Sequence, residues 1–410
     1  MFKYRDNQLM VEDLPLAEIA DRVGTPVYVY SRAAFTTPLD DLESAFKDIP
    51  HLVAFSVKCA SNLSLLGLVA ERGLGADIVS GGELYRALRA GIDPGRVVYS
   101  GVGKTAREMA EALTAGILIF NAESEEELHL LAETAASLKR RARISLRVNP
   151  AVDPGTHPYV ATGLKESKFG LAPEAALKLY RWAAQNPNLE VVGADCHIGS
   201  QLLTASPFLA AAEKLRDLIF QLKKDGLELK YIDLGGGLGV TYQDEAPPSL
   251  AEYAAGLKGI LSGLPGLTLI LEPGRFVAAN SAVLLVKTLY HKTNGDKRFV
   301  ITDGAMNDLI RPSLYGSRHE IAPVRPSGRP EVVVDVVGPI CESGDFLGQD
   351  RRLPALAAGD LLAVKSAGAY GFTMSSNYNS RPRAAEVLVS GGDFRVIRPR
   401  ETYEDLVRGE

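Results

Sequence analysis

The chain has 410 residues, of which 46% are hydrophobic and 23% charged, with a formal net charge of -5. This length exceeds the size at which a single hydrophobic core stops growing, so we expect two domains. Acidic and basic residues are well mixed, which argues against a nucleic-acid partner. No apolar run approaches the ~20 residues of a membrane helix, and the first six residues lack the apolar core of a signal peptide. We therefore expect a cytoplasmic protein.

Short apolar or β-branched runs alternate with longer helical patterns between about residues 25 and 272, as in repeated β-α units. Several runs, such as residues 52–57, are apolar almost throughout, which is typical of strands buried on both faces of a parallel sheet. This pattern favours a closed α/β barrel or a doubly wound sheet. The expected strands are residues 26–30, 52–57, 76–79, 97–100, 117–120, 143–148, 191–196, 231–234 and 268–271.

Small polar and acidic residues at 80–84 and 122–126 are typical of helix N-termini. Polar residues also follow the C-terminal ends of successive expected strands, which is where barrel enzymes build their active sites. We therefore predict a (β/α)8 barrel, similar to the TIM barrel, over residues 26–280. The polar strand-end residues are Lys58, Asp77, Arg147, His197, Gly235 and Glu272.

The pattern changes after about residue 280, where strand-like runs are separated by turns that contain Gly and Pro. A mostly β domain is therefore expected over residues 281–410. Residues 1–25 fit neither the barrel repeat nor a targeting peptide, and we assign them to the same β domain. The strand-like runs are residues 283–289, 298–302, 331–337, 360–364 and 385–389.

Lys58 ends an apolar strand. A desolvated lysine loses its charge more readily and can form an imine with an aldehyde, although a lysine that simply leaves the strand for solvent gives the same pattern. The glycines at 235, 236, 237 and 239 could bring backbone N–H groups close to a phosphate. Tight turns use glycine as well, so this cluster alone leaves both interpretations open.

Glu272 places a carboxylate at another strand end, where it could keep a pyridine nitrogen protonated; an internal ion pair with Arg275 is the alternative. The ring of His197 could stack on a flat cofactor, or it could be a satisfied core histidine. Cys341 and Glu342 follow the apolar run 332–337 and could transfer a proton, although a small thiol also fits a tight turn.

The spacing of the three cysteines, Cys59, Cys196 and Cys341, is that of neither a disulfide framework nor a zinc site. We therefore expect free thiols and no metal.

Eight motifs resemble, in chain order, the pattern of diaminopimelate decarboxylases over nearly the whole chain. The resemblance implies an alanine-racemase-like fold (fold type III), with a barrel that binds pyridoxal 5'-phosphate and a C-terminal β domain. Residues 306–312 and 375–379 also look like this branch of the family. The eight motifs are residues 56–58, 147–150, 156–158 with 168–170, 197–200, 235–237, 272–275, 341–345 and 369–371.

The same resemblance implies roles for individual residues. Lys58 would hold the cofactor through its amine, His197 would lie against the ring, and Glu272 would pair with the ring nitrogen. Cys341 would donate a proton, and Asp77 and Arg147 would either position the cofactor or form a buried structural pair. The implied phosphate ligands are Ser200, Gly236, Gly237, Gly274, Arg275 and Tyr370, and the implied substrate ligands are Arg275, Arg311, Tyr315, Glu342 and Tyr370.

The implied reaction is decarboxylation of meso-2,6-diaminopimelate to L-lysine and CO2, the last step of lysine biosynthesis, in a homodimer with shared sites. A decarboxylase of ornithine, arginine, lysine or carboxynorspermidine is the alternative, and a cofactor carrier without turnover is a second one. Relatives that act on basic amino acids tend to have aspartate in place of Glu342 and no match to Arg311. Cys59 and Ala60 depart from the expected alanine and asparagine, so a contact beside Lys58 is expected to differ.

Overall fold

The computed structural model describes residues 2–153 and 167–410. The chain divides into two compact units. The barrel unit comprises Leu39–Val240 and Ala246–Phe276, and the β unit comprises Met1–Pro38, Thr241–Glu245 and Val277–Glu410. In the described part of the chain, no helix has the length and apolar content needed to span a membrane.

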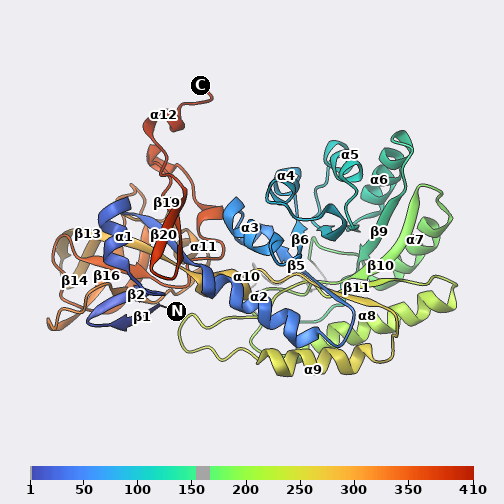
Figure 1. Ribbon diagram of the computed structural model, residues 1–410, viewed down its shortest axis with the longest axis horizontal. Helices are drawn as coiled ribbons and strands as arrows, with labels where there is room; N and C mark the ends of the chain where they lie inside the picture. Colours follow the sequence, from blue (N-terminus) through green and yellow to red (C-terminus); the bar gives the residue numbers. More distant parts are fainter. Residues whose placement is uncertain (1, 154–166) are drawn as a thin grey trace. The chain divides into compact units, whose positions relative to one another are not determined.

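Eight parallel strands of the barrel unit close into a barrel, which confirms the predicted fold class (Figure 1). Each strand pairs with its neighbours in sequence, and β12 pairs with β5 to close the ring. Small and branched side chains fill the interior, including Ala54, Val98 and Ile270. The strands are β5 (His51–Ser56), β6 (Gly75–Ile78), β7 (Val97–Tyr99), β8 (Ile119–Ala122), β9 (Ala142–Arg147), β10 (Leu189–Asp195), β11 (Tyr231–Asp233) and β12 (Thr268–Leu271).

Helices follow the barrel strands and lie around them (Figure 1). Two begin where the polar patterns predict, because a serine caps each one. The side chain of Ser80 accepts from the N–H of Glu83, and that of Ser124 accepts from the N–H of Glu127. The helices are α3 (Leu63–Ala70), α4 (Gly81–Arg89), α5 (Ala106–Ala115), α6 (Glu125–Ser137), α7 (Pro173–Gln185), α8 (Ser206–Lys224) and α9 (Leu250–Leu261). The short helix α10 (Arg275–Ala278) follows β12.

The β unit contains a three-stranded sheet and a nine-stranded sheet. The small sheet consists of β1 (Phe2–Arg5), β2 (Gln8–Val11) and β3 (Leu14–Pro15). The large sheet has the order β17-β16-β14-β13-β4-β19-β20, with β15 and β18 beside it. Its strands are β4 (Val27–Ser31), β13 (Ala282–Asn294), β14 (Lys297–Thr302), β15 (Ile321–Pro323), β16 (Glu331–Val337), β17 (Phe346–Pro354), β18 (Leu361–Val364), β19 (Ala385–Ser390) and β20 (Asp393–Arg398).

The first residues of the chain share a core with this sheet. Leu9 and Ile19 pack with Val283 and Val387 in one buried cluster. Four helices complete the description: α1 (Leu16–Val23), α2 (Arg32–Phe46), α11 (Arg311–Tyr315) and α12 (Tyr403–Leu406). The boundary between the two units falls within α2, after Pro38.

Two segments differ from the boundaries expected from the sequence. Residues 26–30 were expected to begin the barrel, but β4 pairs antiparallel with β13 and parallel with β19 in the large sheet. Every residue of β4 is buried, which is the pattern of a central strand in either sheet, so burial alone could not distinguish them. The segment Thr241–Glu245 lies inside the expected barrel range but belongs to the β unit.

Gly75 tests how closely β6 packs against β7. A Cβ at Gly75 would lie 2.2 Å from the carbonyl oxygen of Arg96. We expect Gly75→Ala to lower the free energy of unfolding, measured with urea, by about 1–3 kcal/mol because the backbone must shift. Gly67→Ala in α3 is the matched control, because no atom lies within 4 Å of the added Cβ. Equal effects of the two substitutions would contradict the packing of β6.

Candidate active site

Lys58 lies at the C-terminal mouth of the barrel, in a 3-10 turn (Val57–Cys59) that follows β5. Its Nζ donates to Asp77 Oδ2 at 2.7 Å, and its side chain is 35% exposed, whereas Asp77 on β6 is fully buried. Ser56 Oγ donates to the same Oδ2 at 2.5 Å. The amine is therefore held by a buried anion, while part of the side chain reaches solvent.

Glu272 follows β12 and is buried. Burial raises the pKa of its carboxyl well above the usual range, and the negative charges of Asp233 and Asp77 raise the pKa further. The charge of Lys58 acts in the opposite direction. A second cationic group beside Glu272, such as a protonated ring nitrogen, would favour the ionised carboxylate.

A chain of hydrogen bonds inside the barrel connects Glu272 with Asp233. Ser100 Oγ donates to Glu272 Oε1 at 3.3 Å. The amide of Asn121 donates to Ser100 Oγ and to Asp233 Oδ2, each at 3.1 Å, and Ser145 donates to the amide oxygen of Asn121. These contacts fix the geometry of two buried acids that lie beneath the barrel mouth.

Asp195 and Asp233 are register partners on β10 and β11. Burial raises the pKa of both carboxyls well above the usual range, and each is raised further by neighbouring carboxylates. Asp195 Oδ1 is buried and accepts no hydrogen bond from any residue in 2–153 or 167–410. The two acids therefore hold protons more strongly than exposed aspartates do.

A glycine turn follows β11 and approaches other parts of the backbone closely. Gly235 and Gly237 have φ of 64° and 116°. A Cβ at Gly236 would lie 2.1 Å from the carbonyl oxygen of Glu272, and one at Gly237 would lie 2.3 Å from that of Gly199. Only glycine fits here, so no side chain covers the turn, and the N–H of Gly235 donates to Asp233 Oδ1 at 2.9 Å. Anion-binding loops use the same close approach of bare backbone.

His197 lies beside this turn. The N–H of Gly236 donates to His197 Nδ1 at 3.3 Å. Burial lowers the pKa of the imidazole well below its usual range, and the charges of Arg147 and Lys58 lower it further, so the ring is neutral. Arg147 donates to Glu123 Oε1 at 2.9 Å and to the carbonyl oxygen of His197 at 3.4 Å, which holds the histidine backbone in place.

Ser200 and Arg275 meet on the same side of the barrel unit, where Arg275 Nε donates to Ser200 Oγ at 3.1 Å. A Cβ at Gly274 would lie 3.0 Å from Ser56 Cβ and 3.3 Å from Cys59 Sγ. Cys59 therefore packs against Gly274, and burial raises the pKa of its thiol, with a smaller opposite effect of Lys58. Cys59, which stands where the family pattern has alanine, therefore makes a packing contact and does not supply a reactive thiol.

The remaining predicted residues lie in the β unit. Arg311 and Tyr315 begin and end α11, and Cys341 and Glu342 lie exposed in the loop after β16. Ser313 Oγ donates to the carbonyl oxygen of Gly344 at 2.5 Å, which ties this loop to α11. The N–H of Cys341 donates to the side chain of Asn379 at 2.7 Å.

Tyr370 has a φ of 57°, a left-handed conformation that is uncommon outside glycine and often accompanies a functional turn.

The structure thus places one group of predicted residues in the barrel unit and the other in the β unit, and the predicted motif at 156–158 lies outside the described residues. The barrel group is Lys58, Asp77, Arg147, His197, Ser200, Gly236, Gly237, Glu272, Gly274 and Arg275, and the β group is Arg311, Tyr315, Cys341, Glu342 and Tyr370. Sequence reasoning missed Ser100, Asn121 and Asp233, which are polar residues inside or directly after apolar strands.

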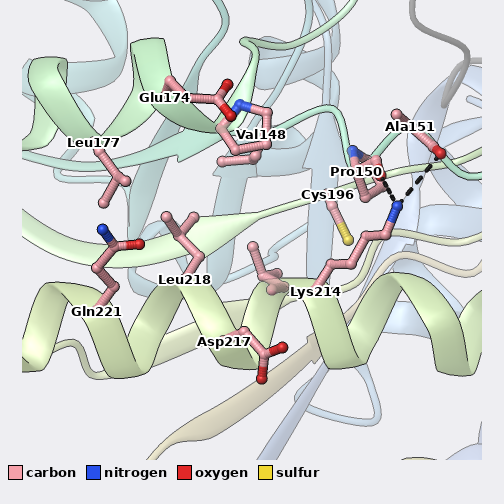
Figure 2. Close-up of a pocket in the computed structure, with 12 residues that line it drawn as sticks. Val148, Pro150, Ala151, Glu174, Leu177, Cys196, Lys214, Asp217, Leu218 and Gln221 are labelled. Carbon is pink, nitrogen blue, oxygen red and sulfur yellow. Dashed lines mark hydrogen bonds between the residues drawn. The ribbon is translucent and has the colours of Figure 1, made fainter.

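A cavity of about 640 Å³ lies between α7 and α8, away from these residues (Figure 2). Cys196 lines it, whereas Asp195 and His197 on either side belong to the candidate site. Lys214 on α8 reaches across the cavity and donates to the carbonyl oxygen of Pro150 at 2.6 Å (Figure 2). No predicted catalytic residue lines this cavity, so it is not the candidate active site.

A lysine beside a buried acid and a glycine turn, at the mouth of a (β/α)8 barrel, defines a barrel of the pyridoxal-dependent class. Residues 33–279 match the family described as "Pyridoxal-dependent decarboxylase, pyridoxal binding domain". A diaminopimelate decarboxylase from Pseudomonas aeruginosa is 53% identical over 100% of this chain and 98% of its own length. The chain belongs to the diaminopimelate decarboxylase family of pyridoxal-dependent decarboxylases.

Solved structures agree with this assignment. The crystal structure of diaminopimelate decarboxylase from Helicobacter pylori complexed with L-lysine is 45% identical, with a TM-score of 0.93 over 96% of this chain and 98% of that one. A lysine/ornithine decarboxylase from Vibrio vulnificus complexed with putrescine is 20% identical, with a TM-score of 0.81 over 92% of this chain and 97% of that one. At 20% identity, the similarity to the lysine/ornithine decarboxylase shows only that the two chains share a fold.

The raised pKa of Asp195 predicts how stability depends on pH. Because the folded protein holds this proton to a higher pH than the unfolded chain, Asp195 destabilises the fold progressively as pH rises above about 4. We expect Asp195→Asn to raise the free energy of unfolding of the cofactor-free protein by about 1–3 kcal/mol at pH 7.5, and by less at pH 4.5.

Urea unfolding at the two pH values measures this effect, with Asp244→Asn at an exposed position as the control. An equal gain in the free energy of unfolding at both pH values would contradict the inference that Asp195 holds a proton in the folded protein.

Proposed function

We propose that the chain binds pyridoxal 5'-phosphate and decarboxylates meso-2,6-diaminopimelate to L-lysine and CO2, the last step of lysine biosynthesis. The observation that carries this proposal is the partly exposed side chain of Lys58, whose amine lies 2.7 Å from buried Asp77 at the barrel mouth of a chain in this family. An amine in this position can capture an aldehyde, because Asp77 holds it in place and can accept a proton.

The residues of the barrel unit fit the cofactor. When bound, pyridoxal phosphate supplies an electron sink for the bond that breaks. Lys58 would hold its aldehyde carbon, Glu272 would pair with its ring nitrogen, and the neutral ring of His197 would lie against its face. Burial disfavours the ionised carboxylate of Glu272, and a positive ring nitrogen would supply the cationic partner that stabilises it. The proposed phosphate ligands are Ser200, Gly236, Gly237, Gly274, Arg275 and Tyr370.

Substrate recognition requires two opposite charges. The non-reacting end of diaminopimelate carries a carboxylate and an ammonium group, and a guanidinium suits the first because its donors match both carboxylate oxygens. We assign the carboxylate to Arg311 with Arg275, Tyr315 and Tyr370, and the ammonium to Glu342.

Cys341 would then donate a proton to the carbon that loses CO2, while Glu342 remains an anion.

The alternative substrates lack one of these charges. Ornithine, arginine and lysine have no second carboxylate, so the buried guanidinium of Arg311 would have no anion to bind. Presence of both Arg311 and Glu342 favours diaminopimelate over these amino acids. A cofactor carrier without turnover would not need Cys341, which supports an enzyme.

Turnover of the purified protein with added cofactor tests the proposal. We expect meso-diaminopimelate to yield L-lysine and CO2, with L-ornithine, L-arginine and L-lysine converted far more slowly. Faster release of CO2 from any of these three amino acids would assign the enzyme to the alternative substrate class.

Lys58→Ala should abolish both the absorbance of bound cofactor and turnover, because it removes the amine to which we assign the aldehyde. Borohydride reduction followed by peptide mapping should find the cofactor on Lys58 in the unsubstituted protein. Lys230→Ala removes an exposed lysine of the same unit and should change neither property. Retention of cofactor and turnover by Lys58→Ala would refute the assignment.

We also propose a cytoplasmic homodimer in which each copy completes the site of its partner. Cys341 and Glu342 are exposed in the single chain, although backbone and side-chain contacts hold their loop in place. An exposed thiol and carboxylate in an ordered loop are suited to a surface that a second copy covers. The three cysteines are free, which fits a reducing compartment.

Mixed dimers test the shared site. Lys58→Ala and Cys341→Ala should each be inactive as homodimers. Unfolding and refolding the two together should restore about a quarter of the unsubstituted activity, because half of the dimers would have one intact site of two. Mixing without subunit exchange is the control. A mixture that stays inactive after exchange would place both residues in a site within one chain.

A further inference from the structure

The guanidinium of Arg311 contacts the side chains of Tyr242, His319 and Ser317 in the β unit. Arg311 Nη1 donates to the hydroxyl of Tyr242 at 2.9 Å and lies 3.1 Å from His319 Nε2. Arg311 Nη2 donates to Ser317 Oγ at 3.3 Å. The guanidinium carbon lies 4.8 Å from the centre of the Tyr242 ring. These contacts hold the plane of the guanidinium in one orientation.

The contacts of His319 determine its protonation state. Its Nδ1 lies 2.8 Å from the carbonyl oxygen of Lys365, which can only accept, so Nδ1 carries a hydrogen. Its Nε2 faces the guanidinium of Arg311, which can only donate, so Nε2 presents a lone pair. His319 is fully buried and is therefore neutral, with a single tautomer. A leucine at this position could not provide the acceptor.

The framework around His319 is ordered by strand pairing. His319 lies two residues before β15, and Lys365 immediately follows β18, which pairs antiparallel with β15. The N–H of Lys365 donates to the carbonyl oxygen of Glu320 at 2.8 Å, and the two side chains form an ion pair of 2.7 Å. The imidazole is therefore fixed by the sheet, and it fixes Arg311 in turn.

Tyr242 reaches Arg311 from the segment Thr241–Glu245. One carboxylate oxygen of Glu245 accepts from the backbone N–H groups of Tyr242 and Gln243, at 2.8 and 2.7 Å. The ring of Tyr242 meets that of His319 edge to face, with centroids 5.4 Å apart. The segment Thr241–Glu245, which belongs to the β unit, thus supplies one of the side chains that contact Arg311.

We propose that Tyr242 and His319 are positioning residues that set the orientation in which Arg311 binds the non-reacting carboxylate, and so select a diamino dicarboxylate over a diamino monocarboxylate. An acceptor on each side of Nη1 restricts rotation of the planar group, and a bidentate contact with carboxylate depends on that plane. This inference rests on the proposed function, whose substrate it concerns.

Three variants separate the acceptor from the bulk of the side chain. Tyr242→Phe keeps the ring and loses the hydroxyl, and His319→Leu loses the acceptor for Arg311. His319→Gln is the conservative variant, because its side-chain oxygen can accept where Nε2 stood.

We expect Tyr242→Phe and His319→Leu to raise KM for meso-diaminopimelate at least roughly tenfold, the effect of losing one hydrogen bond to a charged group. The value of kcat should stay close to that of the unsubstituted enzyme, and His319→Gln should recover most of the loss in KM.

Cadaverine provides the matched control ligand, because it lacks the carboxylate assigned to Arg311, whereas the product L-lysine keeps it. The inhibition constant of L-lysine should rise together with KM, and that of cadaverine should be unchanged in all three variants, measured on holoenzyme with equal cofactor content. A rise of the cadaverine constant in parallel with KM would indicate general distortion and overturn the positioning role. A KM for His319→Gln that is as high as the KM for His319→Leu would also overturn this role.

A second measurement does not depend on turnover. The 15N chemical shifts of the imidazole nitrogens, assigned to His319 by their absence in His319→Gln, should show a hydrogen on Nδ1 and a lone pair on Nε2 at pH 7.5. The opposite tautomer, or a protonated ring, would overturn the inference. Failure of the unsubstituted enzyme to convert diaminopimelate would overturn the proposed function and this inference together, and only the variant and NMR outcomes overturn positioning alone.

Discussion

The ion pair between Lys58 and Asp77 is the interaction on which the barrel site depends. A lysine at the end of an apolar strand has to be compensated, and a fully buried aspartate on the next strand compensates it at 2.7 Å. Ser56 donates to the same carboxylate oxygen, so the anion is held on two sides. The ion pair consequently holds the amine beside Asp77 and restricts the rotamers that an exposed lysine would have.

Buried acids give the site its second property. Glu272, Asp195 and Asp233 lie within one barrel, and burial raises the pKa of each. Hydrogen bonds through Ser100 and Asn121 keep Glu272 and Asp233 apart at fixed geometry. A protonated ring nitrogen beside Glu272, as proposed for the cofactor, would favour the ionised carboxylate of Glu272 and so lower its pKa.

Much of this architecture could be predicted from the sequence. Continuous apolar runs mark the barrel strands, and the first polar residue after a run, such as Lys58 or Glu272, falls at the mouth because parallel strands end at the same edge. Asn121 was not predictable, because one polar residue inside a strand has many possible partners. The position of β4 was not predictable either, because its buried pattern fits both sheets.

Tyr242 and His319 illustrate a different limit. Neither belongs to a motif, and their shared contact with Arg311 exists only because a five-residue excursion and the start of β15 meet in the β unit.

The position of β4 has a consequence for synthesis on the ribosome. Tyr30 of β4 donates to Glu386 of β19 at 3.1 Å, and the two residues are 356 positions apart. A strand that is translated early therefore stays without one of its two neighbours until nearly the entire polypeptide has emerged. During this interval its unpaired edges are exposed to other nascent chains, and such long-range pairing is intrinsically slow. Protection of this apolar segment by a chaperone would then govern the yield of active enzyme.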